Sequence, residues 1–365
     1  MTRLCDWDAM PDLAGQWNAV VEQSPNASVF QTFEWHRCWW DAFGGDEELF
    51  VFLAFVGFRL VGIAPMMIGR CDPCGPAGRA IQFIGSGNHA SDYCDFIVDR
   101  EFPEALEMLL GQICSARRSC PTIYLSHFRR HSPFRNLTLE FFRQRGLGAS
   151  CETQDAAPTR ILGDLDADRN AANKKSLRRH MRFYQKNGEL QFHRPESAAE
   201  TLAWLDAFFE QHKARRALTE SPSQFHDPAQ RNFYARLVRE LAPQGWLRFE
   251  VVLFNGDPIA FHLGFEYRGC FLWYKPTFDA RHASRSPGEV LVKFLLEDAI
   301  KRRLREFDFT VGSEPFKYRF ANEIRHVDRV IAFFSPFDYW RHRLMRGLWR
   351  RAGSMARRLR CLIPA

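Results

Sequence analysis

The chain has 365 residues, of which 25% are charged and 46% hydrophobic, with a formal net charge of +7. This composition excludes a mainly disordered polypeptide, and the length favours two globular units over one ordinary core. Aromatic residues make up 14% of the chain, which favours large cores or ligand clefts. Positive charge is concentrated in two segments that contain no acidic residue, 173–186 and 341–360.

The sequence predicts a cytoplasmic protein. Its first ten residues, MTRLCDWDAM, include acids and no apolar core, unlike a secretory signal. The most hydrophobic run, 49–68, is interrupted by glycines, an arginine and a proline, so it predicts a β-hairpin and not a membrane span of ~20 residues. Ten cysteines are then expected as free thiols in a reducing compartment. Cys71 and Cys74 form one CxxC without a second, so we expect loop thiols and no metal site.

The first half of the chain alternates between helical and strand patterns. Helical spacing dominates residues 1–48. The elements expected after it are strands over 49–54 and 60–68, a strand over 94–98, a helix over 101–117, a strand over 122–125 and a helix over 133–145.

The second half begins with a basic helix over 174–186 that ends at Asn187-Gly188. The elements expected after it are a strand over 188–194, helices over 199–216 and from Asp227, a hairpin over 246–254 and 259–267, a strand over 270–275, a helix from Ser286 and a strand over 307–311. Both halves contain the order hairpin, strand, helix, strand. We therefore predict an α/β (α+β) fold built from two copies of one lobe.

The start of the helix after residue 285 carries the strongest local signal. Ser286 is expected as the N-cap, Pro287 at the first helical position and Glu289 as the partner in a capping box. Gly288 leaves the first turn open on one side. A helix N-terminus presents free N–H groups and the positive end of a dipole, so this turn predicts a phosphate or pyrophosphate site.

Basic side chains precede this turn. Arg281, His282 and Arg285 lie directly before the helix in sequence. Together with Ser286 and Gly288, the two arginines are the predicted residues of the anion site.

This arrangement resembles the GNAT (Gcn5-related N-acetyltransferase) superfamily, in which the pyrophosphate of acyl-CoA binds such a turn. The family motif is (Q/R)xxGx(G/A), and residues 285–290 match its Arg285 and its first glycine, Gly288. Val290 replaces the last small residue. That departure leaves open whether the valine crowds the phosphates or whether the donor is not CoA.

Longer stretches resemble the FemAB-like, two-lobed GNAT group and its CelD-like, cellulose-biosynthesis-associated subset. They include VFQTFEWHRCWWDAFG, NHASDYCDFIV, NKKSLRRHMR and EFDFTVGSEPFKYRFANE. The resemblance implies two tandem GNAT-like lobes, each a mixed, mostly antiparallel sheet flanked by helices. We expect the lobes over 1–157 and 158–336 and a basic amphipathic tail over 337–365. Glu101 occupies the anion seat of the first lobe, which is therefore expected to be degenerate.

GNAT chemistry implies direct attack of an amine on the thioester of acyl-CoA, with no metal. His262 is the candidate base, or else a core histidine. Glu266 is expected on the same strand face, as a proton acceptor or as an ordinary strand-end residue. Tyr274 either protonates the departing thiolate or packs in the core. Asp279 either contacts substrate or caps the basic loop.

The segment after the last strand, GSEPFKYR, supplies the remaining candidates. Lys317 and Arg319 are predicted to hold a phosphate or carboxylate of the acceptor, and Glu314 its amine or proton. The alternative is a salt-bridged lid.

Three functions remain open from the sequence. The first is an N-acyltransferase that moves an acyl group from acyl-CoA, acetyl or longer, to an amine of a small molecule or of a cell-envelope or polysaccharide precursor. The second is an aminoacyl-tRNA-dependent transferase of the FemAB kind that uses the basic helix 174–186. The third is a non-catalytic accessory protein of exopolysaccharide or cellulose assembly. The tail, 338–360, has the composition of an interfacial helix, which predicts peripheral binding to the inner membrane face. The alternative is a disordered tail or a helix docked on a partner.

Overall fold

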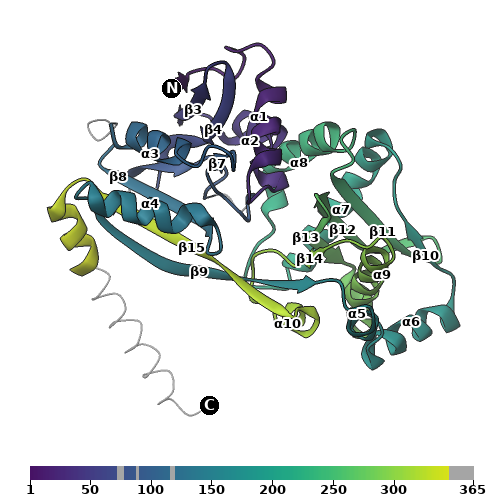
Figure 1. Ribbon diagram of the computed structural model, residues 1–365. Helices are drawn as coiled ribbons and strands as arrows, with labels where there is room; N and C mark the ends of the chain where they lie inside the picture. Colours follow the sequence, from purple (N-terminus) through teal and green to yellow (C-terminus); the bar gives the residue numbers. More distant parts are fainter. Residues whose placement is uncertain (72–77, 88–89, 116–119, 345–365) are drawn as a thin grey trace.

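The computed structural model describes residues 1–71, 78–87, 90–115 and 120–344 (Figure 1). An 11-stranded sheet runs through both halves of the chain in the order β10-β11-β12-β13-β14-β9-β15-β8-β6-β5-β2. Its strands are β2 (Glu48–Leu49), β5 (Met66–Arg70), β6 (Arg79–Phe83), β8 (Thr122–Arg129), β9 (Gly148–Ile161), β10 (Leu190–His193), β11 (Leu247–Phe254), β12 (Asp257–Tyr267), β13 (Cys270–Phe278), β14 (Glu306–Asp308) and β15 (Glu323–Phe333).

A second sheet and the helices complete the two lobes. The second sheet has the order β1-β3-β4-β7, with β1 (Thr2–Leu4), β3 (Val51–Val56), β4 (Arg59–Ala64) and β7 (Ile97–Val98). The α-helices are α1 (Leu13–Gln23), α2 (Phe33–Phe43), α3 (Ala105–Ser115), α4 (Pro133–Gln144), α5 (Leu165–Ala172), α6 (Lys175–Asn187), α7 (Ala198–Arg216), α8 (Pro228–Leu241), α9 (Pro287–Lys301) and α10 (Pro315–Phe320). The short 3-10 helices are η1 (Val29–Gln31), η4 (Gln224–His226) and η5 (Ala280–Arg285).

The expected strand over 60–68 is wrong in one respect, because it divides at Pro65 into β4 and β5, which lie in different sheets. Proline has no N–H to donate to a ladder. The carbonyl of Pro65 instead accepts from the N–H of Ile84 at 2.9 Å. The chain can therefore leave one sheet and enter the other at this residue.

Two long strands connect the lobes. β15 pairs with β9 along its whole length, and the two strands lie side by side from the N-terminal to the C-terminal half in Figure 1. β9 also pairs with β14, while β15 also pairs with β8. The predicted lobe boundary at 157/158 falls inside β9, so a strand of the sheet crosses it.

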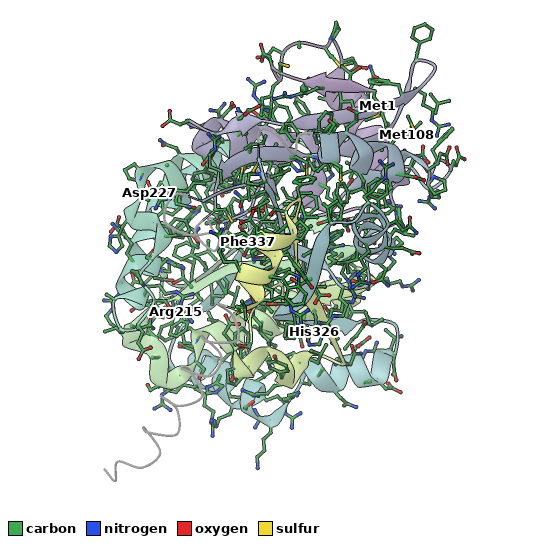
Figure 2. All side chains as sticks on the ribbon, turned by 90° about the vertical axis from the view of Figure 1, so that its left-hand side faces the viewer. Met1, Met108, Arg215, Asp227, His326 and Phe337 are labelled. Atoms are coloured by element: carbon green, nitrogen blue, oxygen red, sulfur yellow. The ribbon has the colours of Figure 1, made fainter. Side chains whose placement is uncertain are left out.

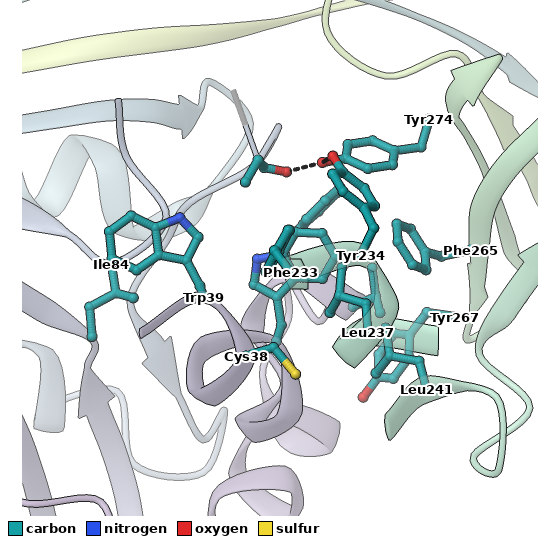
Figure 3. Packing of buried hydrophobic residues seen from close by; sticks show 14 of the residues in the cluster. Cys38, Trp39, Ile84, Phe233, Tyr234, Leu237, Leu241, Phe265, Tyr267 and Tyr274 are labelled. Carbon is teal, nitrogen blue, oxygen red and sulfur yellow. Dashed lines mark hydrogen bonds between the residues drawn. The ribbon is translucent and has the colours of Figure 1, made fainter. Parts of the chain in front are cut away.

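An aromatic core fills the space between the lobes. Trp35 of α2 packs edge-on against Phe233 of α8 and Phe265 of β12, with ring centroids 5.6 and 5.3 Å apart. Figure 3 shows residues of this cluster converging from both halves of the chain, including Cys38, Trp39, Tyr234 and Tyr274. Because these side chains are almost fully buried, they fix the position of β13 relative to the N-terminal helices.

Each lobe contains a parallel strand pair. β6 and β8 meet at Ile81 and Ile123 in the N-terminal lobe, and β13 and β14 pair over three residues in the C-terminal lobe. α9 is the crossover helix between β13 and β14. It packs on one side of the sheet over the core that contains Val290, Leu291 and Phe307.

The C-terminal segment folds back on the N-terminal lobe as far as it is described. Residues 336–344 are helical, and Tyr339 packs on the cluster of Cys71, Tyr124 and Phe333. Figure 2 shows Phe337 on these helical turns and Arg215 on the C-terminal lobe. Within the described ranges, no helix combines the length and the apolar character needed to cross a membrane. Most of the predicted interfacial tail, residues 345–365, and Cys74 lie outside the described residues.

Candidate functional site

The N-terminus of α9 has an open first turn. η5 leads into α9 through Ser286, whose φ of 49° is left-handed. The expected capping box is wrong, because the Ser286 hydroxyl makes no capping hydrogen bond and the Glu289 carboxylate bonds to Arg319 at 2.5 Å. A capping side chain normally needs extended backbone at the N-cap, which Ser286 does not have. The first N–H groups of α9 are thus left without a side-chain cap, as an anion seat requires.

Gly288 and Val290 shape this turn in different ways. A Cβ on Gly288 would lie 3.3 Å from Cδ1 of Phe278 at the end of β13, which is tighter than ordinary contact. Val290 is fully buried in the core beneath α9. The valine that departs from the family motif therefore packs into the lobe and does not crowd the turn.

The basic residues before α9 are held in different ways. Arg281 bonds to the carboxylate of Asp279 at 2.6 Å, and Asp279 also accepts the N–H of Arg281 at 2.9 Å as the cap of η5. Arg285 lies over the ring of Phe183 in α6, 4.1 Å from the ring centroid. The structure thus gathers Arg281, Arg285, Ser286 and Gly288 at one turn, with Asp279 ordering it.

The basic helix α6 lies beside this turn. Arg319 connects the two by bonding to Glu289 of α9 and to the Ser176 hydroxyl of α6 at 3.0 Å. His180 of α6 lies 3.8 Å from Glu289. The exposed basic residues of α6 are Lys175, Arg178, Arg179, Arg182 and Lys186. Arg319 therefore joins the first turn of α9 to α6, and its contact with an acceptor stays a prediction.

β13 and β14 part after a short parallel pairing. Their last pair is Leu272 with Asp308, beyond which β13 continues for six residues without β14 as a partner. The Thr310 hydroxyl donates to the carbonyl of Trp273 at 3.0 Å across the opening. The opening lies at the carboxyl ends of the two strands, where ligands of α/β folds collect.

Charged groups from three segments line the end of this opening. Lys317 is 4% exposed and donates to the Val311 carbonyl and the Glu314 carboxylate, each at 2.9 Å. Asp92, from the N-terminal lobe, has its pKa raised by burial, while the charges of Lys275 and Lys317 act in the opposite direction. Burial lowers the pKa of Lys275. Lys317 and Glu314 thus form an ion pair next to Val311, while Arg319 bonds to Glu289.

Sequence reasoning missed two of these residues. Lys275 is a charged residue inside an aromatic strand, and that contrast was the available signal. Asp92 belongs to a loop of the other lobe, so its approach to β13 depends on tertiary packing alone.

Sequence reasoning also missed Asp308, the last residue of β14. Its side chain is 3% exposed, and the Tyr93 hydroxyl lies 2.9 Å from both carboxylate oxygens. The N–H of Thr310 donates to it at 2.7 Å. Burial raises the pKa of Asp308 to about 6, against the lowering effect of the Thr310 N–H and the charge of Arg129. Asp308 is thus a carboxylate poised near neutral pH at the point where the strands part.

The candidate base His262 occupies a closed position. Its Nδ1 lies 2.8 Å from the Glu250 carboxylate, and its Nε2 accepts the N–H of Tyr274 at 3.4 Å. The ring stacks on Phe271 and Trp273, and its side chain is 0% exposed. Both nitrogens are occupied and water is excluded, so this placement favours a core histidine over a base that reaches an amine.

Glu266 and Tyr274 also have structural partners. Glu266 bonds to Arg248 at 2.8 Å and to Arg302, near the turn that joins β12 and β13. The Tyr274 hydroxyl bonds to that of Tyr234 at 3.0 Å and to the carbonyl of Ala90. Burial raises the pKa of Tyr274 well above its usual value. The four predicted catalytic residues therefore do not converge on one point.

The chain is similar to a known protein family and to several solved structures. Residues 171–318 match the family described as "Acetyltransferase (GNAT) domain". The solved structure of FemX is similar with a TM-score of 0.63 at 10% identity, over 90% of this chain and 97% of that one. L-PGS from Bacillus licheniformis is similar with a TM-score of 0.54 at 12% identity, over 92% of this chain and 96% of that one.

A third solved structure has the same arrangement. The C-terminal domain of a putative lysylphosphatidylglycerol synthetase from Agrobacterium fabrum has a TM-score of 0.55 at 13% identity, over 89% of this chain and 92% of that one. A comparison with curated protein sequences found no match. Residues 171–318 thus match a GNAT-type acetyltransferase domain, and the chain has a two-lobed fold similar to that of FemX.

Proposed function

We propose that this acyltransferase moves an acyl group from acyl-CoA to an amine of a small molecule or of a cell-envelope or polysaccharide precursor. The observation that carries the proposal is the uncapped N-terminus of α9 beside the opening between β13 and β14. The turn at Ser286 would hold the donor pyrophosphate, and the opening beyond Leu272 and Asp308 would admit the thioester. Arg281 and Arg285 add positive charge at the turn.

The chemistry requires one proton acceptor and no covalent intermediate. The neutral amine attacks the thioester carbon, the C–N bond forms and the C–S bond breaks. The amine nitrogen gives up one proton, and the departing thiolate takes one. Asp308 and Asp92 are the carboxylates next to the opening that suit the first transfer. The buried ammonium of Lys317 is suited to balance negative charge at the carbonyl oxygen.

Calorimetry with acetyl-CoA tests the donor site. Arg285→Ala combined with Gly288→Glu should weaken acetyl-CoA binding by at least about tenfold, because it removes a cation and adds a carboxylate at the anion seat. The matched control is Arg143→Ala with Gly111→Glu, since Arg143 is exposed on α4 and a Cβ on Gly111 of α3 meets nothing within 4 Å. Unchanged affinity in the first variant would refute acyl-CoA as the donor.

A second candidate is transfer from aminoacyl-tRNA. It rests on the five exposed basic residues of α6 and on the contact of this helix with the donor turn through Arg319. Binding to a nucleic acid through such a surface would weaken steeply with salt. We therefore compare tRNA binding at two salt concentrations with acetyl-CoA binding. Salt-sensitive tRNA binding that Arg178→Gln with Arg182→Gln abolishes, without any CoA binding, would favour this function over the first.

A further inference from the structure

A partly open cavity of about 230 Å³ lies between the lobes, and Asp308 is one of the residues that line it. The loop 25–28 and Arg129 at the end of β8 form its N-terminal wall. The opposite wall comes from the first residues of β13 and from Arg305, Glu306 and Asp308. Both lobes thus contribute polar side chains to one small space, next to the last paired residues of β13 and β14.

Some charged side chains of this cavity form ion pairs and others do not. Arg325 bonds to the Glu306 carboxylate at 2.7 Å, so these two charges compensate each other. Arg129 lies over the Tyr93 ring, 4.2 Å from its centroid, and donates to the Asn26 carbonyl at 3.3 Å. Among the described residues, neither Arg129 nor Arg305 forms an ion pair, although the charge of Arg129 acts on Asp308 and Arg305 donates to the carbonyl of Arg268. Each guanidinium group has five N–H donors, so both keep donors that can bind an anion at the cavity.

A carboxylate also lines this cavity. It belongs to Asp308, whose hydrogen-bond partners are the Tyr93 hydroxyl and the Thr310 N–H. A carboxylate has acceptor capacity beyond two such bonds, so it can also receive an N–H from an amine. The cavity thus offers guanidinium donors and a carboxylate acceptor to one ligand.

We propose that this cavity binds the acceptor, and that the acceptor carries an anionic group, a carboxylate or a phosphate, close to its amine. This inference rests on the proposed acyl transfer and adds the substrate class. Arg129 and Arg305 hold the anionic group, and Asp308 holds the amine at the point where the strands part. The volume restricts the bound part to about the size of an amino acid or a small aminophosphate.

Calorimetry on the full chain with five probes, in the presence of saturating CoA, tests this. Glycine and phosphoethanolamine carry both groups, whereas ethylamine carries only the amine, and acetate and inorganic phosphate carry only an anion. We expect one or both of the two-group probes to bind at least about tenfold more tightly than any single-group probe. Preference for glycine or for phosphoethanolamine identifies the anionic group as a carboxylate or a phosphate.

Variants distinguish binding in this cavity from a general effect of charge on binding. Arg129→Gln and Arg305→Gln should each weaken the preferred probe by about 10- to 100-fold, because each removes one charge-assisted contact. Arg143→Gln makes the same charge change on the surface of α4 and should leave binding unchanged. Arg305 is exposed, so its variant is informative even if Arg129→Gln fails to fold.

The outcomes distinguish this inference from the donor proposal. If CoA binds but no two-group probe binds at about 10 mM, or if Arg305→Gln leaves the preferred probe unaffected, the acceptor assignment is wrong and the donor site stands. If a two-group probe binds in the absence of any CoA binding, the acceptor cavity stands and the acyl-CoA donor is wrong.

Discussion

The hydroxyl of Tyr93 lies 2.9 Å from each carboxylate oxygen of Asp308, although 214 residues separate the two in the chain. Tyr93 belongs to the N-terminal lobe and Asp308 ends a strand of the C-terminal lobe. The contact therefore joins the two lobes at the carboxylate that lies beside the strand opening. It makes the ionisation of Asp308 depend on the packing of both lobes.

Removing this hydroxyl should destabilise the fold. Tyr93→Phe leaves the buried Asp308 carboxylate with one hydrogen-bond donor fewer, which costs about 1–3 kcal/mol. Urea unfolding followed by circular dichroism measures the difference. Tyr318→Phe is the matched control, because Tyr318 is 41% exposed and its variant should stay within about 0.5 kcal/mol of the parent. Equal stability of the two variants would contradict a bond between the lobes.

The raised pKa of Asp308 predicts how the free energy of unfolding changes with pH. Burial raises it from 3.8 to about 6, so between these values the folded chain binds a proton that the unfolded chain has lost. The free energy of unfolding must then fall as pH rises through this window, and this contribution is fully lost above pH 6. Asp308→Asn should remove a slope of up to about 1.4 kcal/mol per pH unit.

This prediction is measured as the difference between the two urea-unfolding curves at pH values from 4 to 7. Arg129 and Arg325 face Asp308 and keep their charge throughout, so they shift its pKa without adding a slope of their own. A difference in stability that stays constant with pH would show that Asp308 ionises normally.

Glu250 should matter for stability more than for chemistry. Its side chain is 0% exposed and contacts both His262 and Arg194. Glu250→Gln removes the carboxylate that accepts from Arg194 and should cost about 1–3 kcal/mol, because Arg194 is partly exposed and keeps Asp298 as a partner. Acetyl-CoA affinity of the folded fraction should not change. The exposed Glu220→Gln serves as the control, and equal stability of the two variants would contradict a structural role for Glu250.

Asp92 should affect the rate of transfer and not the binding of the donor. Asp92→Asn can neither accept a proton nor balance Lys275 and Lys317, so release of free thiol from acetyl-CoA should slow by about 10²-fold with glycine or phosphoethanolamine as acceptor. Calorimetry should show an unchanged acetyl-CoA affinity. Asp46→Asn, on an exposed turn, is the control. An unchanged rate at Asp92 would exclude it from the reaction.

Local signals predicted much of the C-terminal lobe. Asn187-Gly188 ends α6, Asp227-Pro228 starts α8 and Pro287 starts α9, because caps and prolines act within a few residues. The same signals predicted β13, α9 and β14 in this order. Ser286 occupies the N-cap position as predicted, but its backbone is left-handed and its hydroxyl makes no capping hydrogen bond, so the predicted capping box is wrong.

Strands β9 and β15 were not predicted. β9 reads GASCETQDAAPTRI, and most of its residues are only partly buried. Without regular apolar alternation, such a segment looks like a loop, and only pairing with distant strands reveals it. Asp92 and Asp308 were missed as partners for a related reason. Their significance arises from residues more than 200 positions away, or from another lobe, which no local pattern encodes.

The continuity of the large sheet has a consequence for how the molecule can open. β9 and β15 share backbone hydrogen bonds along 11 residue pairs and carry them from one lobe to the other. A hinge that separated the lobes would have to break that ladder. We therefore expect substrates to enter by movement of side chains and loops. Cutting the chain within β9 would leave two fragments with unpaired strand edges, and neither fragment would be an independent folding unit.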